Sequence, residues 1–324
     1  MSQRAFLAVA ALVVVAGFLV SRVLTNQYYY FAAYVILQYV VLATAWNILG
    51  GYTGYVNFGT PAFFALGAYT SVVLIKTMNA PLGLQLVAGA AVAGLLGLGI
   101  GYLTLRLRGV FFSIATLALA VVLQTLFVNW EYTGGARGLS LIRPATAPLF
   151  GHYVQFLFEV MLILALFAVG VAAWIEHSWI GRGLAAIRDN EEAAECMGVP
   201  TLRLKLVATT VSGALMGLAG APFPYFVTFV EPGSVFDLNY AVNSLAMPMI
   251  GGSTTWVGPI IGAVLLGTAQ QVATVTISSA LNLLIVGVIL VAFVILAPEG
   301  IVGLIQRLAR RREEDVRLAH GKAT

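Results

Sequence analysis

The sequence predicts an all-α membrane protein, a polytopic bundle of about ten transmembrane helices, some of them short or broken. Three observations lead to this prediction. The 324 residues are 60% hydrophobic and only 9% charged, which is more apolar than a soluble core can bury, so lipid must surround most of the chain. Charged residues gather in one internal stretch, 176–205, and in the tail from Glu299 onward. Elsewhere, apolar runs near the ~20 residues that cross a bilayer alternate with short polar breaks.

Ten apolar stretches are candidates for the membrane-spanning helices. The first, which follows MSQR, resembles a signal peptide, but no small-residue cleavage site comes after it, so we expect a retained helix. Glycine, proline, asparagine and threonine interrupt the third and the eighth. We expect residues 1–304 to form one transmembrane domain and residues 305–324 a polar tail. The stretches lie near 5–22, 28–50, 56–76, 82–104, 110–130, 153–175, 206–229, 238–251, 259–277 and 280–297.

The distribution of positive charge predicts which side faces the cytoplasm. If both termini are cytoplasmic, thirteen of the 17 Lys and Arg residues lie in inner segments and four in outer segments. Inner loops of membrane proteins carry such an excess. The stretch 176–205 is therefore expected in the cytoplasm, and the pI of about 9.2 needs no nucleic-acid partner to explain it.

Several kinds of chemistry are disfavoured by the sequence. Cys196 is the single cysteine and the three histidines lie far apart, so we expect no disulfide and no metal site. The carboxylates of the sixth span, Glu159 and Glu176, are expected near its ends, where they would not serve ion-coupled transport. The sequence lacks the G-x-x-x-x-G-K-[ST] phosphate loop. We expect no catalytic residue and no cofactor, and an energy source on another polypeptide.

The stretch 176–205 carries the signals of a short helix. Asp189 can cap its first amides, with Glu192 completing a capping box, while Gly198 and Pro200 would end it. Helices shorter than roughly 12–15 residues are marginal alone in water. We therefore expect it to dock, either on its own bundle or on a separate subunit. The apolar stripe available for docking is Leu184, Ile187, Ala194 and Met197.

Two other segments combine polar residues with helix breakers, at 50–61 and 250–259. Irregular backbone at membrane depth is tolerated where protein or a water-lined cavity satisfies its amides. Each segment is thus either a break in a discontinuous helix that lines a pathway, or an ordinary cytoplasmic loop.

Residues 181–198, GRGLAAIRDNEEAAECMG, resemble the EAA-type loop of ABC importer permeases. More narrowly, they are similar to the LivM-type permease subunits of branched-chain amino acid transporters. The likeness extends over most of the chain in the same order. Its other motifs are NILGGYTGY at 47–55, RLRGVFF at 106–112, TGG at 133–135, SGALMGLAG at 212–220, GG at 251–252 with GP at 258–259, and PEGIVGL at 298–304.

The resemblance implies a non-catalytic, multi-pass subunit of an ATP-driven importer in the cytoplasmic membrane, translocating branched-chain or other hydrophobic amino acids. Its implied partners are a second homologous permease, two cytoplasmic ATPase subunits that bind the ATP, and a periplasmic or lipid-anchored solute-binding protein. The resemblance also implies which residues couple this chain to the ATPase. They are Gly181, Arg182, Arg188, Asp189, Glu191, Glu192, Ala193, Ala194, Glu195 and Gly198.

The substrate stays open at this point. A zwitterion needs hydrogen-bonding groups along its path, so we expect Asn57, Thr60, Thr116 and Gln124 to line it. The family commonly has Ser-Phe-Gly-His where this chain has Asn57-Phe58-Gly59-Thr60. Related permeases carry urea, short amides or, more distantly, simple sugars. Alternatives of other classes are an autonomous secondary carrier or channel, or a membrane anchor without a pathway.

Overall fold

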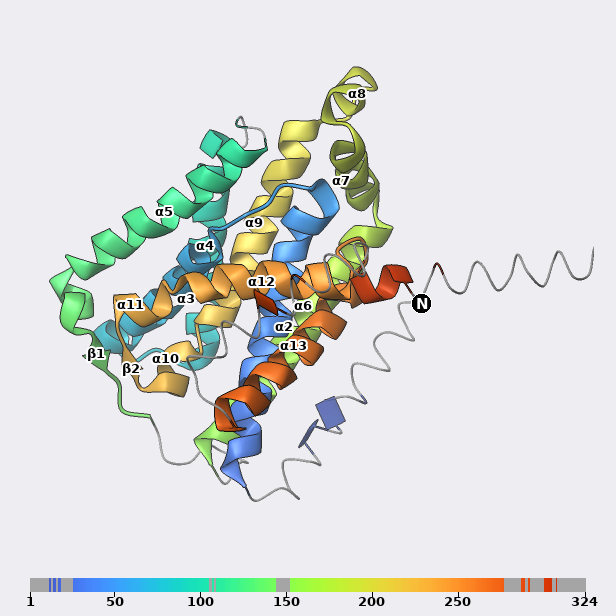
Figure 1. Cartoon of the computed structure of the whole chain (residues 1–324). Helices are drawn as coiled ribbons and strands as arrows, with labels where there is room; N and C mark the ends of the chain where they lie inside the picture. Colours follow the sequence, from blue (N-terminus) through green and yellow to red (C-terminus); the bar gives the residue numbers. More distant parts are fainter. Residues whose placement is uncertain are drawn as a thin grey trace, which may run out of the picture.

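The computed structural model describes residues 12, 14, 15, 17, 18, 26–104, 107, 109–143, 152–276, 287, 288, 291, 300–304 and 307. Within these ranges the chain is a helical bundle with one small antiparallel sheet (Figure 1). The elements are α2 (Gln27–Thr53), α3 (Thr60–Met78), α4 (Leu82–Thr104), α5 (Val110–Val128), η1 (Glu131–Thr133), η2 (Gly135–Arg137), β1 (Leu139–Ser140), α6 (Tyr153–His177), α7 (Trp179–Asp189), α8 (Glu191–Cys196), α9 (Thr201–Gly220), α10 (Phe223–Val227), β2 (Phe229–Val230), α11 (Pro232–Val235), α12 (Leu238–Gly251) and α13 (Val257–Thr276).

The predicted polytopic all-α architecture is confirmed, but the count of about ten spans is not. In the described part of the chain, 7 helical segments are long and apolar enough to cross a membrane: α2 to α6, the continuous stretch Thr201–Val227, and α13. The expected span 238–251 is α12, whose 14 residues extend only about 21 Å at 1.5 Å per residue. The expected first and last spans, 5–22 and 280–297, lie almost entirely outside the described residues.

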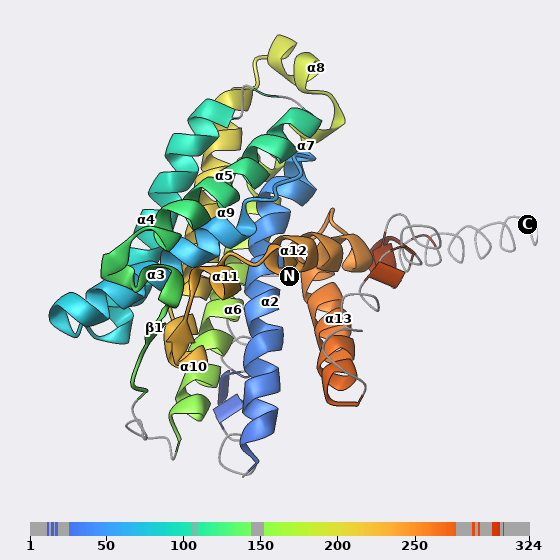
Figure 2. The same cartoon turned by 60° about the vertical axis from the view of Figure 1, so that its left-hand side comes forward.

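The loops lie at two opposite ends of the bundle, and hydrogen bonds connect the loops of each end. At one end, β1 pairs with β2, and Lys76 Nζ at the end of α3 donates to the carbonyl of Tyr132 (2.7 Å). At the other end lie the α2–α3, α6–α7 and α12–α13 junctions. Here the Tyr52 hydroxyl lies 3.1 Å from the carboxylate of Glu176. Figures 1 and 2 both show α8 at the tip of this second end.

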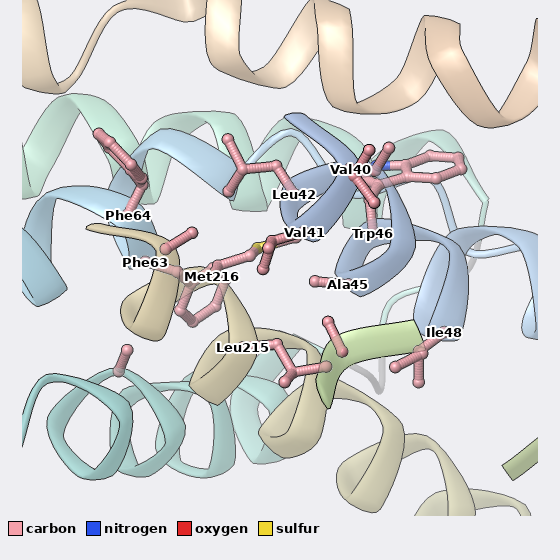
Figure 3. Packing of buried hydrophobic residues seen from close by; sticks show 14 of the residues in the cluster. Val40, Val41, Leu42, Ala45, Trp46, Ile48, Phe63, Phe64, Leu215 and Met216 are labelled. Atoms are coloured by element: carbon pink, nitrogen blue, oxygen red, sulfur yellow. The ribbon is translucent and has the colours of Figure 1, made fainter. Parts of the chain in front are cut away.

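The buried core centres on α2, which packs against α6, α9, α12 and α13. Its residues from Val40 to Tyr52 are almost completely shielded. Figure 3 shows Val41 and Ala45 of α2 facing Met216 of α9, with Phe63 and Phe64 of α3 nearby. Because α2 is apolar on all sides, it fits the middle of a bundle rather than its lipid-facing surface.

Glycines allow α3, α4 and α9 to pack with their backbones in contact. A Cβ added to Gly67 of α3 would collide with the carbonyl of Gly217 of α9. A Cβ at Gly217 would in turn lie 2.6 Å from the carbonyl oxygen of Gly89 in α4. Small residues commonly produce such close approaches between membrane helices. The three helices therefore form a rigid wall beside α2.

Exposed aromatic side chains occur near both ends of the bundle. Tyr and Trp concentrate at membrane–water interfaces because their rings are apolar and their tips polar. Tyr28 and Trp130 lie at the β1–β2 end, whereas Tyr102, Trp174 and Trp179 lie towards the end that carries α8. This arrangement predicts that α8 lies outside the apolar layer, in water.

Candidate functional site

The helices α7 and α8, residues 179–196, form an elbow. It lies at the end of the bundle that also holds the α2–α3 and α12–α13 junctions. Ser178 starts α7, because its hydroxyl accepts the N–H groups of Ile180 (3.1 Å) and Gly181 (3.4 Å). Leu184 and Ile187 are buried, which fixes α7 against α2, α6 and α9. Of the two alternatives for this stretch, packing on its own bundle describes α7, while docking on a separate subunit stays a prediction.

The second arm of the elbow, α8, has only six residues. Its cap is Asn190, whose side chain accepts the N–H of Ala193 at 3.0 Å. The predicted Asp189–Glu192 capping box is therefore wrong, because α7 continues through Asp189 and the chain first becomes extended at Asn190. Gly198 has a φ of +84°, as expected for a residue that ends a helix in the left-handed region.

The apolar stripe expected along the elbow divides into two parts. Leu184, Ile187 and Ala194 are buried within the bundle, but Met197 is 85% exposed. Met197 lies beyond the end of α8, where it no longer shares a face with Ala194. An apolar side chain in this position is available to a partner.

The structure brings the ten predicted coupling residues together on or beside this elbow. Their role in coupling stays a prediction. Exposed residues are Arg182, Arg188, Asp189, Glu192, Ala193, Glu195 and Gly198; Gly181 and Glu191 are half-buried, and Ala194 is buried.

A hollow of about 360 Å³ lies between α7 and the segment that joins α8 to α9. Exposed Trp179, Arg182 and Met197 contribute to its rim, so both apolar and cationic groups face it. The lining residues are Trp179, Arg182, Gly183, Ala186, Met197, Gly198, Val199, Pro200 and Leu204.

Glu191, the first residue of α8, points inward. Its Oε1 atom accepts a hydrogen bond from Lys205 Nζ of α9 at 2.6 Å, and its Oε2 atom accepts one from the Tyr55 hydroxyl. Tyr55 belongs to the segment between α2 and α3. The elbow is thus tied directly to that segment.

The break between α2 and α3 comprises residues 54–59. Gly54, with a φ of +77°, ends α2, and Thr60 begins α3. Asn57 is almost fully buried and folds the break through its own side chain, whose Oδ1 accepts the N–H of Gly59 at 2.7 Å. The Asn57 carbonyl accepts the indole N–H of Trp46 at 2.8 Å. These bonds satisfy polar groups that are buried in the protein.

Three of the four predicted pathway residues meet at this break. The Thr116 hydroxyl of α5 accepts the N–H of Phe58 at 3.1 Å. The hydroxyls of Thr60 and Ser244 of α12 lie 3.0 Å apart. Gln124 is half-buried and lies about two turns further along α5, apart from the other three. Asn57, Thr60 and Thr116 are all buried, so any path here is closed in this conformation.

A second break, residues 252–256, separates α12 from α13. Glu176 at the end of α6 accepts the backbone N–H of Trp256 at 2.6 Å. Deeper in the bundle, Gln270 Nε2 of α13 donates to Asn243 Oδ1 of α12 at 2.7 Å, and Asn243 Nδ2 donates to the Tyr39 hydroxyl at 3.3 Å. The half-length helix α12 is therefore held by polar contacts as well as by packing.

A comparison with known protein families matches residues 28–294 to the branched-chain amino acid transport system / permease component family. The chain belongs to this family. Among curated proteins, it is 29% identical to the high-affinity branched-chain amino acid transport system permease protein LivM of Escherichia coli K12, over 92% of this chain and 75% of that protein. It is 25% identical to the probable branched-chain amino acid transport permease protein LivH of Methanocaldococcus jannaschii, over 82% and 88%.

The resemblance to LivM-type permeases is thereby confirmed, and the chain is an integral, multi-pass permease component. A more distant relative is the autoinducer 2 import system permease protein LsrC of Yersinia enterocolitica, 24% identical over 62% of this chain and 57% of that protein. No solved structure matches the chain.

Several residues of the permease site were missed by sequence reasoning. Tyr55 belongs to the motif at 47–55 and Ser244 to no motif, but neither position indicated a contact with the elbow or the break, and Lys205 entered only as a positive charge of the inner loop. Lys205 is 3% exposed. A buried lysine requires an anionic partner, so a lysine within the first turns of a membrane helix was the available signal for an internal ion pair.

Proposed function

We propose that this permease is a non-catalytic subunit of an ATP-driven ABC importer in the cytoplasmic membrane, and that it translocates branched-chain or other hydrophobic amino acids. In this proposal, ATP is bound and hydrolysed by two cytoplasmic partner subunits. The elbow docks onto one of them, with both termini of the permease on the same side. The family and the relatives named above support the transport role, and the elbow supports the mode of coupling.

The observation that carries the coupling proposal is α8 itself. A helix of six residues, such as α8, is too short to persist alone in water. Yet α8 lies at the tip of its end of the bundle (Figure 2). Beside it lie the 85% exposed Met197 and a hollow of about 360 Å³. An exposed apolar side chain beside a hollow that apolar groups and an arginine line has the composition of a protein interface.

The other partners follow from the same assembly. This chain is similar to two different proteins of Escherichia coli K12 that are both named high-affinity branched-chain amino acid transport system permease protein, LivM and LivH. This pairing supports a second, homologous permease beside the present chain. A periplasmic or lipid-anchored solute-binding protein would dock at the β1–β2 end, where Ile142 is 96% exposed.

We propose that the substrate passes along the α2–α3 break. The residues that line its path are Asn57, Thr60, Thr116 and, further along α5, Gln124. These groups are polar and uncharged, which suits a zwitterion that carries both charges with it. The LsrC relative, whose name gives autoinducer 2 as its cargo, supports a second candidate in which the permease carries another small polar solute, such as urea, a short amide or a sugar.

Co-purification and uptake together test the proposal. The permease, purified from its own cells, should retain an ATPase in detergent, and vesicles with the binding protein should take up leucine in preference to urea and ribose when ATP is supplied. Preference for urea or ribose would support the second candidate. Flux through the permease alone, driven by an ion gradient or passive, would favour an autonomous carrier or channel.

Matched variants locate the docking surface. Met197→Asp should reduce the retained ATPase at least tenfold, because it places a charge in an apolar contact. Ile142→Asp, at a position of even greater exposure (96%) at the opposite end, should leave ATPase retention unchanged. Equal retention in both variants would contradict docking at the elbow.

A further inference from the structure

We propose that the cluster formed by Glu191, Lys205 and Tyr55 is the link through which displacement of α8 reaches the α2–α3 break. We call these three residues the node. Glu191 is thus a positioning residue that acts inward on the path, and it is not a contact for the ATPase. The inference rests on the proposed docking of the elbow and assigns the element that transmits the resulting movement.

The three side chains of the node contact one another. Lys205 Nζ lies 2.6 Å from Glu191 Oε1, 3.2 Å from the Tyr55 hydroxyl oxygen and 4.7 Å from the centre of the Tyr55 ring. The Tyr55 hydroxyl donates to the second carboxylate oxygen of Glu191. Each carboxylate oxygen of Glu191 therefore has a partner on a different element, one on α9 and one in the break.

Because the node is buried, its contacts are costly to separate. The side chain of Lys205 is 3% exposed and that of Glu191 is 14% exposed. A buried ion pair is weakly screened, and separating it would leave an uncompensated charge out of water. The neighbouring Arg188–Asp189 pair differs in this respect, since its side chains are 33% and 73% exposed and pairs of that kind contribute little.

The position of Glu191 in α8 determines what the node can transmit. Glu191 is the first residue of a helix of six, so any rigid movement of α8 must displace its carboxylate. At the other end of the helix, Glu195 Oε1 accepts a hydrogen bond from Thr201 of α9 (2.6 Å). Of these two glutamates, Glu191 provides the connection to the break.

From Tyr55 the contact continues to the predicted path residues. The Tyr55 ring packs edge-on against Phe112 of α5, with 5.3 Å between centroids. The Val56 carbonyl accepts the hydroxyl of Ser113 at 2.8 Å, and the N–H of Phe58 donates to Thr116. A shift of Tyr55 thus moves the backbone on either side of Asn57 relative to α5.

The test uses the assembled importer with spin labels at two sites. One label is attached to the native Cys196, the exposed last residue of α8, and the other to Val56→Cys in the break. ATP should change the spectra of both labels in the wild-type background. In Tyr55→Phe, which keeps the ring on Phe112 and the Lys205–Glu191 pair, the Cys196 label should still respond. The response at position 56 should fall at least threefold, and leucine uptake per ATP hydrolysed at least fivefold.

Two controls complete the experiment. Thr125→Val, at an exposed position whose hydroxyl bonds within α5 to the carbonyl of Val121, should leave both spectral responses and uptake within twofold of wild type. The double variant Glu191→Lys with Lys205→Glu should recover part of the uptake lost in Glu191→Lys alone. The proposal is overturned if position 56 fails to respond in wild type while Cys196 does, or if Tyr55→Phe transports normally. An ATPase that does not bind the wild-type permease would instead contradict the proposed function.

Discussion

Glu176, at the cytoplasmic end of α6 in our proposed orientation, accepts the backbone N–H of Trp256 at 2.6 Å, across 80 residues of sequence. The same carboxylate oxygen accepts the hydroxyl of Tyr52 at 3.1 Å. One side chain therefore joins the end of α2, the end of α6 and the α12–α13 break. The α2–α3 break likewise donates a hydrogen bond, from Tyr55 to Glu191, so each of the two helix breaks donates to a glutamate on or next to the elbow.

We predict that Glu176→Ala destabilises the permease by about 1–3 kcal/mol, because the Trp256 N–H would be left without its acceptor. Glu176→Gln retains an acceptor oxygen and should lose about 1 kcal/mol or less. Thermal unfolding in detergent measures both changes. Hydrogen exchange at the Trp256 amide should accelerate in the Ala variant and much less in the Gln variant; equal rates would show that the bond is not formed.

Thr60→Val removes the hydroxyl that lies 3.0 Å from Ser244 while preserving the shape of the side chain. Because Thr60 is fully buried, we expect a loss of about 1 kcal/mol in stability together with a lower rate of uptake. Thr125→Val is the matched control, since its hydroxyl bonds only within α5, to Val121. A Thr60 variant that transports at the wild-type rate would remove this residue from the path.

The glycine contacts predict opposite effects for two alanine substitutions. Gly67→Ala places a methyl group on the carbonyl of Gly217 and should cost at least about 2 kcal/mol, as overpacking of backbone does. Gly99→Ala has no atom within 4 Å of the added Cβ and should stabilise the helix by about 0.5–1 kcal/mol. Melting temperatures of the two variants should move in opposite directions, and a common direction would contradict the packing described for α3 and α9.

Glu159 lies within α6 and is 6% exposed, and its Oε1 atom has no hydrogen-bond partner among the described residues. A buried polar atom without a partner costs about 1–3 kcal/mol. We therefore expect Glu159→Gln and Glu159→Leu to transport as wild type, and Glu159→Leu to melt at a higher temperature. Loss of uptake in both variants at normal stability would assign the carboxylate a role in transport.

Apolar length and helix-breaking residues predicted most of the membrane helices, because those features act within one segment. The half-length of α12 was not predicted as such. Its Asn243 and Ser244 are satisfied by Gln270, Tyr39 and Thr60, and such partners become visible only when the helices are packed.

At the elbow, sequence reasoning found the right segment but misplaced some of its details. Asp189 and Asn190 are both good caps, so the sequence alone does not say at which of them α7 ends. Glu191 and Glu192 are adjacent acidic residues of the same first turn, yet Glu191 bonds Lys205 and Tyr55. Only the arrangement of α9 and the α2–α3 break distinguishes them.

Cross-linking from Cys196 tests the central claim most directly, because this residue is the single cysteine of the chain and is exposed on α8. A photoreactive reagent attached to it in membranes containing the assembled importer should yield one main product, the permease joined to its ATPase, and ATP should change the yield. Cys196→Ser with Ile142→Cys should give no such product. Failure of the Cys196 reagent to capture the ATPase, in membranes where uptake is active, would contradict docking at the elbow.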